Sequence, residues 1–169
     1  MRECNSDGYG IFVFVPYLSP TVEGNKIKGC YVGLGAFGGA VAGQGATFAS
    51  NSVNGAGATT TDPNGTYGAY LTTDQLGFGS GDLTATLTGN TLVHSGTGMF
   101  VTQEAGSQAT VSASGNSFVA DGAGAKGDSG TVVNAANNWW ACAQGPNMGG
   151  HCTTATGTVQ FTPWLTARP

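Results

Sequence analysis

The chain has 169 residues and 30 glycines, only 8% of its residues are charged, and its formal net charge is −4. This length suits one domain, and so little charge with so much glycine is untypical of a helical protein. Five basic residues cannot form the patch that nucleic acid requires, and no apolar run is long enough to insert into a bilayer. We therefore expect a single packed β-domain over residues 1–169, with neither nucleic acid nor a membrane as its partner.

A short motif centred on asparagine recurs along the chain at intervals of 26, 39, 26 and 22 residues. Apolar residues stand five and three positions before the asparagine and two positions after it, as Ala85, Leu87 and Leu92 do around Asn90. This alternation places apolar side chains on one face of short strands. The five repeated asparagines are Asn25, Asn51, Asn90, Asn116 and Asn138.

A unit of 22 to 26 residues that carries short strands and corner glycines is typical of one coil of a solenoid. The pattern predicts an all-β fold, a right-handed parallel β-helix (a single-stranded solenoid) of about five to six coils. Coils would occupy residues 1–138, and residues 139–169 would form a tryptophan-rich C-terminal cap. The repeated asparagines are expected to stack as a structural ladder at one corner.

A second strand is predicted after a turn in each coil, beginning at Gly10, Gly33, Gly68, Gly98 and Gly130. Counting from each asparagine to the next of these glycines predicts two long excursions, 54–67 and 119–129. They should leave the solenoid at the same corner and flank the short turn 93–96 between them.

The two excursions predict a cleft in which carboxylates lie beside a histidine and a tyrosine. Such a group suits general acid–base chemistry or calcium binding, and the tyrosine suits stacking on a sugar. Turn chemistry alone also explains the Asp residues. We expect no resident metal or cofactor, with calcium at these carboxylates as the alternative. The candidate cleft residues are Asp62, Tyr67, His94, Asp121, Lys126 and Asp128.

The four cysteines form two pairs that are close in sequence, Cys142 with Cys152 and Cys4 with Cys30. The first pair lies in a Gly/Pro-rich segment with little core of its own, which a disulfide would stabilise. Disulfides indicate an extracellular or cell-surface location, although no signal peptide is evident. Buried thiols that never pair are the alternative, above all for Cys4 and Cys30.

The asparagine repeat is followed by Trp139-Trp140, by the paired cysteines and by Pro163-Trp164-Leu165. With this ending the chain resembles the C-terminal portion of right-handed parallel β-helix repeat proteins of the pectate-lyase-like superfamily. The resemblance implies a secreted or surface protein and carbohydrate as the ligand. The superfamily's catalytic residues match no position of this sequence.

Three functional hypotheses follow. The first is a non-catalytic secreted or surface module that presents a carbohydrate-binding or interaction face. The second is a small polysaccharide lyase or glycoside hydrolase with its cleft around His94. The third is a structural oligomerisation piece, because no cap is predicted at the N-terminal end, where Asn5 and Gly10 already resemble positions within a coil. That end would pair with a second copy of the chain, or the chain would be a piece of a longer solenoid.

Overall fold

The computed structural model describes the whole chain except residues 1, 5–7, 17, 40–43, 56–64 and 120–121. Its described part is all-β and forms a parallel β-solenoid of about 5 turns, as predicted from the asparagine repeat. No helix long and apolar enough to cross a membrane occurs among the described residues.

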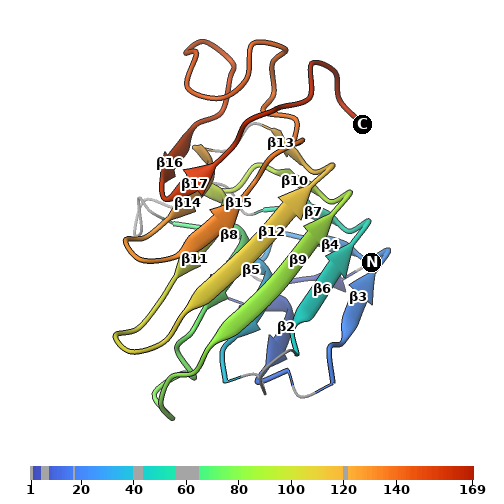
Figure 1. The fold of residues 1–169 in the computed structure, drawn as a ribbon. Helices are drawn as coiled ribbons and strands as arrows, with labels where there is room; N and C mark the ends of the chain where they lie inside the picture. The colour runs from blue at the N-terminus through green and yellow to red at the C-terminus, as the bar shows by residue number, and fades with distance from the viewer. Residues whose placement is uncertain (1, 5–7, 17, 40–43, 56–64, 120–121) are drawn as a thin grey trace.

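Three parallel sheets form the walls of the solenoid (Figure 1). Each of the first five turns contributes one strand to each sheet, and β16 and β17 then extend two of the sheets. Sheet A follows the asparagine corner and contains β1 (Arg2–Glu3), β4 (Lys26–Lys28), β7 (Ser52–Asn54), β10 (Thr91–Val93) and β13 (Ser117–Val119). Sheet B contains β2 (Tyr9–Phe14), β5 (Val32–Phe37), β8 (Tyr67–Thr72), β11 (Thr97–Thr102), β14 (Ala123–Gly127) and β16 (Ala155–Gly157). Sheet C contains β3 (Thr21–Glu23), β6 (Ala46–Ala49), β9 (Leu83–Thr88), β12 (Ala109–Ser114), β15 (Val132–Asn134) and β17 (Val159–Gln160).

The core fills the space between the three sheets with side chains that the period-two pattern points inward. In the middle turn, Leu87 of β9, Leu92 of β10 and Met99 of β11 are all fully buried. Each inward residue packs on its equivalents in the turns above and below, because neighbouring strands pair in register. Stacking is thus what removes the apolar stripe of each turn from water.

Hydrogen bonds join the five repeated asparagines at the corner between sheets C and A. The Oδ1 of Asn90 accepts from both the backbone N and the Nδ2 of Asn51, each at 3.0 Å. The second proton of the Asn90 amide is donated to the carbonyl of Phe48 at 2.9 Å. The same pattern links Asn25 to Asn51, Asn90 to Asn116 and Asn116 to Asn138.

Two linked predictions are wrong. The second strand of this turn does not begin at Gly130, and residues 119–129 are not one long excursion. Residues 123–127 form β14 of sheet B, whereas β15 belongs to sheet C and pairs Val133 with Val111. Strand β14 was missed because small residues, glycine and alanine, occupy its inward positions. A Cβ at Gly124 would lie 2.9 Å from the Trp140 ring and 2.7 Å from Thr153 Oγ1, so the space is already filled by the C-terminal segment.

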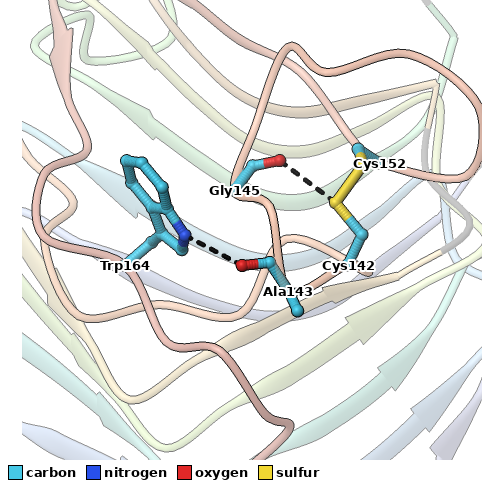
Figure 2. Close-up of a disulfide and its surroundings, with 5 residues drawn as sticks. All are labelled: Cys142, Ala143, Gly145, Cys152 and Trp164. Carbon is cyan, nitrogen blue, oxygen red and sulfur yellow. Dashed lines mark hydrogen bonds between the residues drawn. A yellow bond between two sulfur atoms is a disulfide. The ribbon is translucent and has the colours of Figure 1, made fainter.

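The C-terminal segment closes one end of the solenoid, which lies at the top of Figure 1. Rings of Phe118, Trp140, Phe161 and Trp164 follow one another over the last turn, and Trp140 is fully buried. Figure 2 shows the Cys142–Cys152 disulfide beside Trp164, whose Nε1 donates to the carbonyl of Ala143 at 3.1 Å. The aromatic cluster agrees with the predicted tryptophan-rich cap, but β16 and β17 also lie within residues 139–169 and extend sheets B and C by one strand each.

At the opposite end, a second disulfide joins Cys4 to Cys30 and ties the first turn to the next. Strands β1, β2 and β3 each lie at an edge of their sheets. The inward side chains of Ile11, Val13 and Val22 are only partly buried there, although they pack against the core.

Candidate functional site

The residues of the predicted cleft divide between two places in the structure. His94 occupies the turn between sheets A and B, and Tyr67, Lys126 and Asp128 belong to sheet B or to its end. Asp62 and Asp121 lie outside the described residues. Residues 123–127 form β14, so the second of the two long loops predicted to flank His94 is not present as predicted.

His94 is exposed and held in a left-handed turn conformation, with φ of 57°. Its Nδ1 lies 3.1 Å from the Oδ1 of Asn54 in the turn below. Within the described part of the chain, no group of three or more His, Cys, Asp and Glu side chains is placed to hold a metal. Among the described residues, the side-chain hydrogen bond of His94 is thus to Asn54.

Tyr67 and Lys126 instead flank Phe100 on the outer face of sheet B. The Tyr67 ring is stacked on Phe100 with centroids 5.5 Å apart, and the Lys126 Nζ lies 4.7 Å from the centroid of the Phe100 ring. Lys126 also lies 3.9 Å from an oxygen of Asp128, but both side chains are more than 40% exposed, so this ion pair stabilises the fold little.

The outer face of sheet B carries an aromatic row that crosses the strands. Phe12, Gly35, Tyr70, Phe100 and Lys126 occupy the same register position in successive strands. Outward positions of adjacent parallel strands repeat about every 4.8 Å, so large side chains at this position must contact one another. The row runs from the first turn to the fourth and is interrupted at Gly35 in the second turn.

Gly35 is the one position of this row without a side chain, and Phe37 fills the gap. A Cβ at Gly35 would lie 3.3 Å from the Phe37 ring, which is 1% exposed. The Phe37 ring contacts Phe12 at 5.9 Å and Tyr70 at 6.1 Å between centroids. An aromatic ring placed over a strand glycine is a known way of stabilising a sheet surface.

Four tyrosines wall a hollow of about 160 Å³ on this face, here called the tyrosine pocket. The Tyr31 ring meets Tyr67 edge to face at 5.8 Å, and Tyr67 lies 5.2 Å from Tyr70. Both polar and apolar atoms line the hollow, because each tyrosine contributes a ring and a hydroxyl. Its lining residues are Tyr9, Tyr31, Val32, Tyr67 and Tyr70.

Burial raises the pKa of Tyr9 and of Tyr70 above the ordinary value of 10.0. For Tyr70 a hydrogen bond with Thr72 opposes this effect without cancelling it. The two phenols are therefore neutral at physiological pH, when a hydroxyl can both donate and accept a hydrogen bond.

Sequence reasoning identified Tyr67 but not the other tyrosines of the pocket. A signal was present, since an aromatic residue stands two positions after the strand glycine in Gly10-Ile11-Phe12, Gly68-Ala69-Tyr70 and Gly98-Met99-Phe100. In a regular strand, a residue two positions after an inward glycine would also point inward. Here the register skips one residue, between Tyr67 and Ala69, so the aromatic residue reaches the outer face. Tyr9 and Tyr31 carry no such pattern.

Comparison of the chain with protein-family models, with curated proteins and with solved structures found no match in any of the three.

Proposed function

We propose that this chain is a non-catalytic β-solenoid module that binds carbohydrate at the tyrosine pocket on the outer face of sheet B. The observation that carries the proposal is a hollow of about 160 Å³ walled by four tyrosines. A pyranose has apolar C–H faces and a rim of hydroxyls, and rings with neutral phenolic hydroxyls are suited to both. The resemblance of the C-terminal sequence to pectate-lyase-like β-helix proteins supports the same ligand class.

The proposed setting is the extracellular space or the cell surface. Two disulfides, Cys4–Cys30 and Cys142–Cys152, favour an oxidising compartment. Only 8% of the residues are charged, so a neutral polymer that lies on this surface displaces water from few charged side chains.

Affinity electrophoresis in gels that contain neutral and acidic polysaccharides tests the proposal. We expect at least one polysaccharide to retard the protein, and Tyr9→Ala or Tyr67→Ala to weaken retention about tenfold. Thr110→Ala, an exposed change on sheet C, is the matched control and should be retained like the wild type. Equal retention of all variants would place any binding elsewhere on the molecule.

A companion assay separates the module from the polysaccharide lyase or hydrolase. The module should release no product from the polysaccharide that retains it. Turnover that His94→Ala abolishes, in a variant that still folds, would replace the module by an enzyme with its site at the turn between sheets A and B.

Self-association is a second candidate function, favoured by exposed apolar side chains in the first three turns. Phe14, Leu18 and Phe78 are 42%, 88% and 83% exposed, and β2 lies at the edge of sheet B. A second copy would cover these side chains and pair with the strand edges. Mass measured by light scattering should then rise with protein concentration and should stop rising in Phe14→Ser.

A further inference from the structure

A second hollow of about 200 Å³ adjoins the tyrosine pocket and has a different chemistry. It is lined by Tyr9, Phe12, Phe37 and Leu76, and only apolar atoms form its wall. Tyr9 belongs to both hollows, so the two share a wall on the outer face of sheet B. We call this second hollow the Leu76 pocket.

Leu76 reaches the pocket from an unusual turn. Asp74 and Ser80 form an antiparallel bridge, and the backbone N of Phe78 donates to the carbonyl of Gln75 at 3.1 Å. Within this turn Leu76 has φ of 56° and Gly77 has φ of 84°. Asn, Asp and Gly are the residues that favour two successive left-handed positions, so a leucine there is exceptional.

The turn is anchored to the solenoid. A Cβ at Gly39 would lie 2.0 Å from the Nε2 of Gln75, and one at Gly81 would lie 3.2 Å from the same atom, so both glycines make room for this side chain. The backbone N of Gly81 donates to the carbonyl of Thr73 at 3.0 Å. Leu76 is thus held over Phe37 by fixed neighbours, yet it remains 48% exposed.

We infer that the two hollows form one two-part site whose ligand is a sugar that carries an apolar substituent. This inference rests on the proposed function, because it places the sugar ring in the tyrosine pocket and the alkyl, acyl or aryl group in the Leu76 pocket. No charged side chain lines either hollow among the described residues, so the ligand is uncharged at both parts. Burial of the substituent against Phe12, Phe37 and Leu76 adds affinity that the sugar alone does not have.

Titration calorimetry with paired methyl and hexyl pyranosides of glucose, galactose, mannose and N-acetylglucosamine tests the inference. For the pairs that bind, the hexyl form should bind about tenfold more tightly or better than the methyl form. Hexanol, which has the chain but not the sugar, should bind more weakly than the hexyl pyranoside.

Leu76→Gly is the decisive variant because glycine accepts the left-handed backbone while it removes the apolar wall. It should unfold at no lower temperature than the wild type and should lose the preference for hexyl over methyl pyranosides. Phe78→Ala, in the same turn but outside both hollows, is the control and should keep the preference.

The outcomes separate the inference from the function on which it rests. Binding of methyl and hexyl forms with equal affinity, or a hexyl preference that survives Leu76→Gly, overturns the two-part site and leaves carbohydrate binding standing. Binding of hexanol as tightly as of the hexyl pyranosides also overturns it, because the sugar would then contribute nothing. If none of the eight pyranosides binds, the inference is overturned. The proposed function is tested separately, by retention of the protein in polysaccharide gels.

Discussion

Four of the five ladder asparagines are buried, and their side-chain amides form their hydrogen bonds within the protein. In the middle turns the Oδ1 accepts two bonds from the asparagine of the turn below, and the Nδ2 donates to the next asparagine and to a backbone carbonyl. A network of this kind stabilises one stacking register, since any slip leaves several buried polar groups unpaired.

Replacement of Asn90 by alanine should therefore be costly. It leaves the backbone N and the Nδ2 of Asn51 without their acceptor in a buried place. We expect the free energy of unfolding to fall by about 2–4 kcal/mol in urea titrations. Asn54→Ala, which removes an exposed asparagine and its contact with His94, should cost no more than about 1 kcal/mol, and equal losses in both variants would contradict a special role for the ladder.

The tyrosine pocket gives the protein a pH dependence of known sign. The pKa of Tyr70 is raised in the folded state by burial, so the folded protein holds this proton more tightly than the unfolded chain. Stability from this group is fully present below about pH 10 and is lost as the pH rises further. Urea titrations at increasing pH should show this decline and a shallower one in Tyr70→Phe, whereas identical slopes would show that Tyr70 does not contribute.

At the scale of the elements, the sequence was most informative where large apolar side chains mark the strands. Leu87, Leu92 and Met99 identified the three strands of the middle turn, and all are fully buried. Strand β14 was missed because it has glycine or alanine wherever it faces inward. A search for alternating apolar residues cannot detect such a strand, because Trp140 from another segment fills the core space next to it.

The contacts within the candidate site could not be predicted from the sequence for a similar reason. Tyr9, Tyr70 and Phe100 point outward, as simple alternation or a skipped residue in the strand allows. Their mutual contact, however, depends on which strands are neighbours. The Leu76 turn depends on Gly39 and Gly81, which are far apart in sequence and adjacent in space. The proposed two-part site could therefore not be predicted before the fold was known.

The cap should depend on one tryptophan of the adjacent pair. Trp140 is fully buried against Phe118, whereas Trp139 is only partly buried. Trp140→Ala should lower the free energy of unfolding by about 3–5 kcal/mol, and Trp139→Ala should lower it by clearly less. Thermal and urea unfolding monitored by circular dichroism would check this, and similar losses in both variants would contradict the assignment of Trp140 as the core of the cap.

At the scale of the whole molecule, each turn contacts chiefly the turns beside it, so stability should vary along the solenoid axis. The C-terminal end has an aromatic cap, and the other end has edge strands and partly buried core residues. Local opening should therefore begin at β1 to β3 and reach the central strands last.

Hydrogen exchange followed by mass spectrometry would measure this gradient. Amides of β2 and β3 should exchange faster than those of β9 and β12. Replacing Cys4 and Cys30 by serine should speed exchange in the first turns alone, and replacing Cys142 and Cys152 should speed it near β16 and β17. Uniform exchange along the chain would instead indicate a single cooperative unit.

One corner of the solenoid shows how freely such a chain can be lengthened. Asn51 and Asn90 are 39 residues apart, whereas Asn25 and Asn51 are 26 apart, yet both pairs bond at the same 3.0 Å. Nine of the 13 additional residues lie between β7 and β8 and four between β8 and β9, and these strands still pair in register with the strands on either side. A foreign peptide grafted at this corner should be displayed without disturbing the strands around it, which makes the protein a candidate scaffold for epitope presentation.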